Sequence, residues 1–311
     1  MERICEFQNY IDYNELKDKY KINQYELVNL SIGYDEIVYL LFSKSVPERV
    51  NGMFVPTNSN TDYKCIILVV DWNTNEILGS QIYDLGIQEP NIHFIQPIGN
   101  ELLLLGARAH LYKDGNTDKN AVITDRYGTV IKKFCLGDGI QDCIVTSDNK
   151  IITSYFDEGI FGNNGWDNPL GRNGIIIWNK TGEKTWENTK YDICDCYAIN
   201  IDGQNNLWFY YYTDFNLVKT NFFNDQVYDV NIDGSSAFLI NKKQNEIIFD
   251  GGYNKHNQFI GYRLDRDIIK GKFGFDVIYN STRLLLKRYT FRSSKAVFID
   301  NNNRIFCKDF L

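Results

Sequence analysis

Two adjacent carboxylates, Asp157 and Glu158, stand at the end of an apolar stretch in the segment SYFDEGIFGNNGW. On an extended strand, neighbouring side chains point to opposite faces. One carboxylate could therefore face a ligand while the other pairs with Arg108 or Arg172. A carboxylate crowded by another negative charge has a raised pKa and can act as an acid or a base. Asp157 and Glu158 are the candidate catalytic residues of this chain.

Other polar and aromatic residues follow apolar strands at the corresponding position. They are Arg108, His110, Tyr155, Asp157, Glu158, Tyr212, Asp214 and Asp250. Loops at one edge of a rigid scaffold commonly build a ligand site. This pattern predicts a polar mouth that binds a small polar ligand or peptide, with Tyr155 and Tyr212 as stacking surfaces. The alternative is that charges appear there only because solvent begins where strands end.

Two long loops are candidate covers for this mouth. The segment 159–173 is rich in Gly and Asn and contains Trp166, and the segment 43–63 contains Arg49, Met53 and Phe54. Long loops without regular structure are often functional lids. Both loops can equally be insertions that the scaffold tolerates.

Metal and cofactor chemistry finds little support. The histidines, His93, His110 and His256, form no pair at i, i+2 or i, i+4 spacing. Cys194 and Cys196 lie two apart, but no second Cys or His pair accompanies them. The chain has no GxSxG, HExxH or P-loop motif. We therefore expect neither a metal nor a cofactor.

A repeat fixes the fold class better than these residues fix a function. Six times an apolar strand enters a short polar turn and leaves as a second apolar strand, about every 40 to 65 residues. The pairs are LVNLSIGYDEIVYLLF, FIQPIGNELLLLG, CIVTSDNKIITSYF, YAINIDGQNNLWFYYY, AFLINKKQNEIIFDG and AVFIDNNNRIFCKDF. Repeats of this size are typical of β-propellers, whose blades have four strands. The sequence predicts an all-β, six-bladed β-propeller, with seven blades as the alternative.

The predicted propeller is a single domain over residues 1–311. The blades are expected at 25–90, 91–138, 139–190, 191–231, 232–280 and 281–311, the last completed by 1–24. The C-terminal segment supplies only two apolar strands, so RICEFQNY is expected to join the last blade and close the ring, which removes exposed edges. Alternatively, Asp12 and Glu15 cap a short helix through YNELKDKYKI.

The outer hairpins share their own turn chemistry. Asp71, Asp125, Asn179 and Asn221 open turns in which their side chains can bond nearby amides. A positive φ is expected three or four residues later, at Gly128, Gly182, Asn224 and Asn75. These residues are turn formers and not calcium ligands, because no Dx[DN]x[DN]G run accompanies them.

Composition limits the partners and the compartment. The formal net charge is −7 and no basic cluster occurs, so a nucleic-acid partner is not expected. No apolar run is long enough for a membrane span. The N-terminal segment MERICEFQNY has no apolar leader core, and seven is an odd number of cysteines. We expect reduced thiols in a cytoplasmic protein.

Two segments resemble known families. GIIIWNKTGEKTW, with Gly182 and Trp186, resembles the repeat of pyrroloquinoline-quinone-type propellers. SYFDEGIFGNNGW, DCYAINI and LWFYYYTDF are similar to uncharacterised bacterial cytoplasmic β-propeller proteins. Both resemblances imply the propeller fold, and neither implies an activity.

Three functions stay open from the sequence. The first is a binding module with a polar mouth and no turnover. The second is a lyase or hydrolase that acts on a carbohydrate or peptide, with Asp157 or Glu158 as acid or base and Arg108 as an electrostatic clamp. The third is a protein-interaction scaffold.

Overall fold

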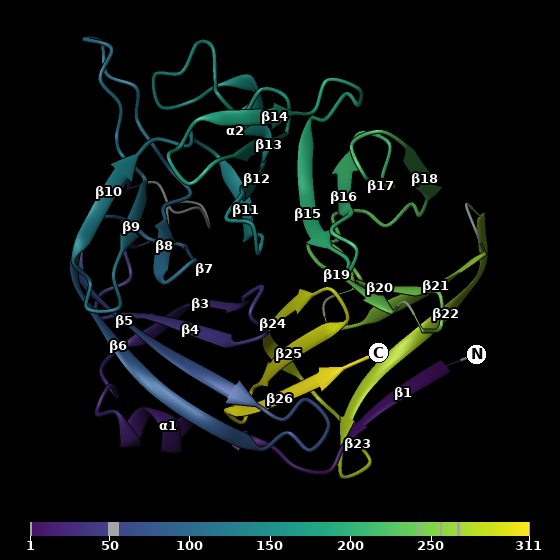
Figure 1. The fold of residues 1–311 in the computed structure, drawn as a ribbon. Coiled ribbons are helices and arrows are strands. Elements are labelled where there is room, and N and C mark those ends of the chain that lie inside the picture. The colour runs from purple at the N-terminus through teal and green to yellow at the C-terminus, as the bar shows by residue number, and fades with distance from the viewer. Residues whose placement is uncertain (1, 49–55, 242, 256, 266–267, 311) are drawn as a thin grey trace. The chain divides into compact units, whose positions relative to one another are not determined.

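The computed structural model describes residues 2–48, 56–241, 243–255, 257–265 and 268–310. Across these residues the chain forms six β-sheets and two short helices (Figure 1). The sheets follow one another along the chain, and chain neighbours within a sheet pair antiparallel. This is the six-bladed β-propeller that the sequence predicts, each sheet being one blade.

The chain divides into two compact units. The central unit comprises Ile22–Leu68 and Ser80–Cys196, and the terminal unit comprises Met1–Lys21, Val69–Gly79 and Tyr197–Leu311.

Sheets one to three lie largely in the central unit. Sheet one has β3 (Glu26–Ile32), β4 (Val38–Ser43), β5 (Asn58–Val70) and β6 (Ile77–Pro90). Sheet two has β7 (Phe94–Ile98), β8 (Glu101–Leu105), β9 (Ala121–Thr124) and β10 (Val130–Phe134). Sheet three has β11 (Ile140–Val145), β12 (Ile151–Tyr155), β13 (Ile175–Trp178) and β14 (Lys184–Glu187), and α2 (Asp157–Phe161) follows β12.

Sheets four to six lie largely in the terminal unit. Sheet four has β15 (Asp195–Ile201), β16 (Leu207–Tyr212), β17 (Asn216–Thr220) and β18 (Asp225–Asp229). Sheet five has β19 (Phe238–Asn241), β20 (Glu246–Asp250), β21 (Phe259–Asp265), β22 (Ile268–Tyr279), β23 (Thr282–Arg283) and β1 (Glu2–Phe7). Sheet six has β24 (Leu286–Arg292), β25 (Lys295–Asp300), β26 (Arg304–Asp309) and β2 (Ile11–Asp12).

In four sheets the second strand is covered on both faces. β4, β12, β20 and β25 are buried along their whole length. In five sheets the apolar pairs seen in the sequence are the first and second strands. In sheet six the pair is β25 and β26, the second and third strands, because β24 pairs with the other edge of β25. The expectation of only two C-terminal strands is therefore wrong.

The N-terminal segment forms both of the structures considered for it, with different partners. β1 pairs in parallel with β22, from Glu2 opposite Gly274 to Phe7 opposite Tyr279, so it belongs to sheet five and not to the last blade. The last blade is instead completed by β2, which pairs with Arg304 and Ile305 of β26. The N-terminal segment thus adds one strand to each of two sheets, as Figure 1 shows for β1 beside β22.

The helix α1 (Tyr13–Lys19) begins directly after β2. The Asp12 side chain accepts hydrogen bonds from the backbone amides of Asn14 and Glu15, at 2.8 and 3.1 Å. These bonds satisfy two amides that the first turn of a helix leaves unpaired. Asp12 is therefore the N-cap that the sequence predicts.

The side chain of Phe7 ties β1 to the core of the terminal unit. It is buried and lies 5.0 Å from the ring of Phe306 and 6.2 Å from that of Phe298, between ring centroids. Burying one such ring stabilises the fold by roughly 1.5–3 kcal/mol. The opposite face of β1 is open, and Ile4 there is 65% exposed.

The outer turns follow the predicted chemistry. Each of the four opening residues accepts at least two backbone amides: Asp71, Asp125, Asn179 and Asn221. Asn75, Gly128 and Gly182 have positive φ. In the remaining turn the positive φ falls on Phe222 and not on Asn224. The expectation for Asn224 is therefore wrong, since this turn reverses two residues earlier.

Candidate functional site

Arg108 lies in the central unit between two carboxylates. Its Nε is 3.0 Å from Oδ1 of Asp138, and its guanidinium donates to Oε2 of Glu158. Its side chain is 6% exposed and also lies over the ring of Phe156. Of the two arginines considered from the sequence, Arg108 is the partner of Glu158. The guanidinium is thus engaged by the protein itself.

The two carboxylates differ in protonation behaviour. Burial raises the pKa of Asp138, although Arg108, the Ala109 amide and Asn164 favour its charged form. For Glu158 burial acts in the same sense, but hydrogen bonds from Asn163 and Arg108 outweigh it and lower the pKa. The ion pair of Arg108 with Asp138 is deeply buried and costly to break, because the charge that remains would have no contact with solvent.

Tyr155 and Trp166 are also held by the interior of the central unit. Tyr155 is fully buried, and its hydroxyl donates to the carbonyl of Leu136. Burial raises the pKa of this hydroxyl far above its ordinary value. The Trp166 indole N–H donates to the carbonyl of Ala109 at 2.8 Å, and 7% of the residue is exposed. Their rings are packing elements and offer little surface for stacking a ligand.

Asp157 and Glu158 do not lie on a strand. They form the first turn of α2, so the extended conformation expected for them is wrong. The chain turns because Gly159 approaches the backbone of Gly139 and Asp138, where a Cβ would lie 2.5 Å from the Asp138 carbonyl oxygen. Asp157 itself is exposed.

His110 lies near these residues in the same unit. Its ring is 4.6 Å from that of Tyr112, and its backbone amide donates to Asp118. His93 accepts a hydrogen bond from the amide of Ala107 through Nδ1. His256, Arg49, Met53 and Phe54 lie outside the described residues.

The three remaining predicted residues belong to the terminal unit. Tyr212 is 41% exposed and lies 5.3 Å from the ring of Phe215. Asp214 accepts a hydrogen bond from the Tyr211 hydroxyl. Asp250 is buried and accepts from the amide and hydroxyl of Ser236 and the amide of Gly252; burial nevertheless raises its pKa.

Sequence reasoning missed Asp195, the first residue of β15. Burial raises the pKa of Asp195 to about 7, and the negative charge of Asp157 adds to the shift. Its Oδ1 is buried and has no hydrogen-bond partner among the residues that the structure describes. The only signal was its place between Cys194 and Cys196, which drew attention to the thiols. Burial raises the pKa of both thiols, so they are poor nucleophiles.

The described part of the chain contains no group of three or more His, Cys, Asp or Glu side chains that could hold a metal ion. All seven cysteines are free thiols. Neither helix within the described ranges has the length and apolar character required to cross a bilayer.

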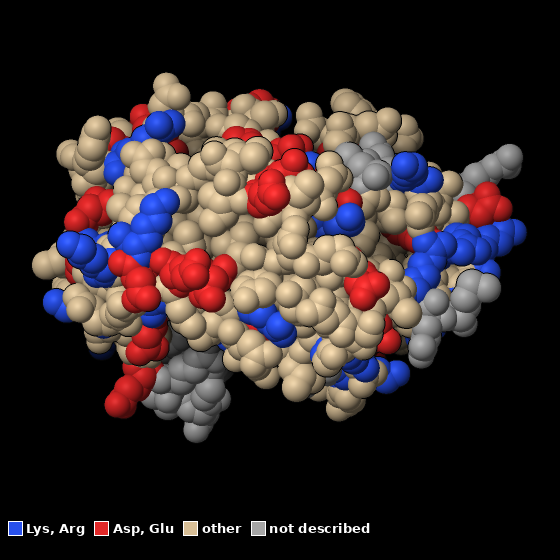
Figure 2. Space-filling view, turned by 90° about the horizontal axis from the view of Figure 1, so that it is seen from below, with Lys and Arg blue, Asp and Glu red and all other residues tan. Residues whose placement is uncertain are grey.

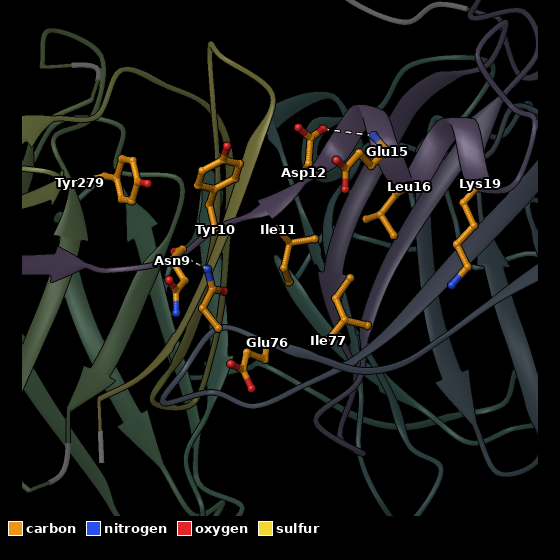
Figure 3. Close-up of a pocket in the computed structure, with 11 residues that line it drawn as sticks. Asn9, Tyr10, Ile11, Asp12, Glu15, Leu16, Lys19, Glu76, Ile77 and Tyr279 are labelled. Carbon is orange, nitrogen blue, oxygen red and sulfur yellow. Dashed lines mark hydrogen bonds between the residues drawn. The ribbon is translucent and has the colours of Figure 1, made fainter.

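A groove of about 840 Å³ opens in the terminal unit, between the N-terminal segment and the tip of the β5–β6 hairpin. Figure 3 shows Tyr10 and Tyr279 on one side of it, and the α1 side chains Glu15, Leu16 and Lys19 on the other. We call it the acidic groove, because its lining has three carboxylates and one ammonium group. The lining residues are Asn9, Tyr10, Ile11, Asp12, Glu15, Leu16, Lys19, Asn75, Glu76, Ile77 and Tyr279.

The aromatic side of the acidic groove is rigid. The rings of Tyr10 and Tyr279 meet edge to face, with centroids 5.6 Å apart. The Arg304 guanidinium lies 4.9 Å from the Tyr279 ring and 5.7 Å from the Tyr10 ring, and Asp300 holds it at 2.6 Å. Tyr10 nevertheless remains 41% exposed. It is therefore a fixed aromatic surface beside free carboxylates.

Glu15 and Glu76 are the free carboxylates. Both are exposed, and neither has an ion-pair partner among the residues described. On the face of the molecule in Figure 2, acidic and basic side chains are interspersed. The acidic groove therefore stands out through its unpaired charge and not through the net charge of the chain.

Comparisons with known proteins support the fold. A family model described as the YxzG family matches residues 171–247. No curated protein matches the chain.

Solved structures match over most of the chain at low identity. A chain of the crystal structure of the Mitotic Checkpoint Complex is 8% identical with a TM-score of 0.51, covering 97% of this chain and 95% of that one. The structure of YCF48 bound to D1 peptide is 10% identical with a TM-score of 0.51, covering 92% and 78%. Selenomethionine-substituted virginiamycin B lyase from Staphylococcus aureus is 11% identical with a TM-score of 0.45, covering 96% and 97%. The first two likenesses bear out the propeller fold.

Proposed function

We propose that this chain is a binding module without turnover, whose acidic groove takes a basic segment of a peptide or protein. The observation that carries the proposal is the pair of unpaired carboxylates, Glu15 and Glu76, on elements that border one groove beside the exposed ring of Tyr10. Exposed tyrosine rings often anchor interfaces. Charge of one sign steers an oppositely charged partner and selects it.

The predicted mouth is less suited to this role. Polar groups of three predicted residues already bond partners within the central unit: Arg108, Tyr155 and Trp166. A ligand would have to break those contacts before it could use them. The acidic groove demands no such rearrangement, since Glu15, Glu76 and Tyr10 are already exposed. Two propellers of similar fold occur in a multiprotein complex and with a bound peptide, which fits a binding role.

An array of fluorescent 12-residue peptides of varied charge tests the proposal. We expect retention to rise with Lys and Arg content and to fall with added salt. The double variant Glu15→Gln, Glu76→Gln should weaken binding of the best peptide about tenfold, because each exposed ion pair contributes roughly 0.2–1 kcal/mol. The matched control, Glu26→Gln with Asp167→Asn, removes the same charge from exposed positions of the central unit. Equal binding by both double variants would overturn the proposal.

A second function has one specific observation in its favour. The pKa of Asp195 is raised to about 7 by burial and by Asp157, which suits a general acid at neutral pH. A lyase or hydrolase acting on a carbohydrate or peptide would use the carboxyl groups of Asp195 and Asp157. Turnover of a chromogenic glycoside or peptide library that Asp195→Asn abolishes would favour the enzyme over the binding module.

The compartment belongs to the same proposal. We propose a cytoplasmic location, because free, mostly buried thiols are what a reducing compartment maintains.

A further inference from the structure

A second cavity lies between sheets four and five of the terminal unit. Its volume is about 260 Å³, and its lining residues come mainly from strands β16 to β21 and the β19–β20 turn. Pockets for drug-sized ligands occupy roughly 300–1,000 Å³. This cavity therefore suits something smaller, of the size of a single sugar ring.

Glu246 gives the cavity an unsatisfied acceptor. It is the first residue of β20 and is 1% exposed. Its Oε1 pairs with Arg3 at 2.7 Å and with Arg263 at 3.5 Å. Its Oε2 is buried and lacks a hydrogen-bond partner within the described residues. A buried acceptor without a partner is expensive, so a ligand that donates a hydrogen bond to Oε2 recovers that cost.

Amide groups beside Glu246 complete a polar wall. Asn241 is buried, and its Oδ1 accepts from the amide of Gln244 while its NH₂ group has no partner among the residues described. Asn245, an exposed residue of the turn, and Gln226 of β18 also line the cavity. An amide NH₂ beside a carboxylate presents a donor and an acceptor to adjacent hydroxyl groups.

The aromatic part of the cavity lining is held in place by its neighbours. The rings of Trp208 and Tyr228 are stacked, with centroids 5.9 Å apart and planes 6° from parallel. The Trp208 indole N–H donates to Asp202 at 3.2 Å, which holds the ring in place. Lys219 lies over Trp208 at 5.3 Å and adds a donor to the lining. The cavity is therefore preformed, and binding would cost little reorganisation.

Charge decides which donor fits. Two cations, Arg3 and Arg263, pair with Glu246, and Lys219 adds a third positive charge to the cavity lining. Asp202 is the other carboxylate of the lining. Asp202 is already occupied by Trp208, Asn206 and two backbone amides. An added ammonium group would meet positive charge, whereas a neutral hydroxyl can use Oε2 without that repulsion. We propose that this cavity binds a small neutral polyhydroxylated ligand.

Saturation-transfer NMR on the full chain tests the assignment. The probes are glucose, mannose, galactose and myo-inositol, with methylamine as the charged alternative. We expect a signal from at least one neutral probe, and a shift of the Trp208 indole N–H resonance on titration. Asn241→Ala should weaken that probe at least tenfold, and the exposed control Asn301→Ala should not. Glu246→Gln should weaken it further, although this change also loosens the contact with Arg3.

The outcomes separate cleanly. Absence of signal from every neutral probe, or undiminished binding in both Asn241→Ala and Glu246→Gln, would refute the site. Binding of methylamine alone would refute the polyhydroxylated class. The acidic groove uses other residues, so neither result bears on the basic-peptide proposal.

Discussion

Asn75, at the tip of the β5–β6 hairpin, accepts a hydrogen bond from the backbone amide of Cys307 in β26 at 2.8 Å. Its own amide group donates to the carbonyls of Asn9 and Ile305. Since β2 pairs only with Arg304 and Ile305, the amide of Cys307 lies beyond the reach of that short strand. One side chain thus closes a sheet edge that the chain end leaves open.

Asn75→Ala should destabilise the protein by about 2–3 kcal/mol. The change leaves the Cys307 amide unpaired, which costs roughly 1–3 kcal/mol. It also places alanine at a φ of 63°, which asparagine tolerates better. Urea unfolding measures the loss, and Asn73→Ala, at an exposed position of the same turn, is the control. A loss below 0.5 kcal/mol would contradict the role given to Asn75.

Arg108→Ala should cost about 3–5 kcal/mol, because it leaves Asp138 buried without its cation. The loop that carries Asn164 and Trp166 is bonded to the same region, so we also expect altered Trp fluorescence. The control is Arg172→Ala, an exposed arginine of the same segment. If both variants unfold at the same urea concentration, the buried ion pair does not stabilise this unit.

Asp195 should make stability fall as the pH rises. Its pKa is about 7 in the folded protein, above the value of roughly 4 in an unfolded chain. The protonated form is thus favoured by folding, so this contribution is complete below pH 4 and is lost progressively up to pH 7. The slope is at most about 1.4 kcal/mol per pH unit, and solvent at the part-exposed side chain reduces it.

Melting temperatures from pH 4 to 8 measure this effect. The difference between Asp195→Asn and the unaltered protein should grow in favour of the variant up to pH 7 and then level off. Asp192→Asn, at an exposed neighbouring position, should show no such trend. Parallel curves for all three proteins would rule out a raised pKa at Asp195.

Phe7→Ala should detach β1 from the terminal unit. The ring packs on Phe306 and Phe298, and removing a buried Phe side chain typically costs about 3–5 kcal/mol. Limited proteolysis should then cleave the N-terminal segment faster. Ile4→Ala, on the exposed face of the same strand, should cleave like the unaltered protein. Equal cleavage of Phe7→Ala would show that strand pairing alone holds β1.

The sequence revealed the strands that are buried on both faces, because their apolar runs need no partner to be recognised. β24 escaped notice because its sequence, LKRYTFR, mixes charged residues with partly buried aromatic ones and contains no apolar run. The parallel pairing of β1 with β22 joins residues more than 260 positions apart. Periodicity within a strand carries no information about such a partner.

The candidate site was harder to predict for a related reason. Charged residues at strand ends were visible, but whether Arg108 faces solvent or Asp138 depends on packing across three sequence segments. Asp195 looked ordinary because its raised pKa comes from burial and from Asp157, a residue 38 positions earlier. The acidic groove draws on the N-terminal segment, the tip of the β5–β6 hairpin and Tyr279 of β22. No local sequence pattern predicts a groove that is built from segments so far apart in the chain.

β1 and β2 precede their partners β22 and β26 by more than 260 positions along the chain. β1 and β2 therefore have no sheet edge to join until β22 and β26 have been synthesised. The pairings that complete sheets five and six are thus contacts of large sequence separation, which are slow to form. A circular permutant that joins the present ends and opens at the loop between sheets three and four would bring β1 and β2 close in sequence to β22 and β26. We expect this permutant to fold faster than the unaltered protein.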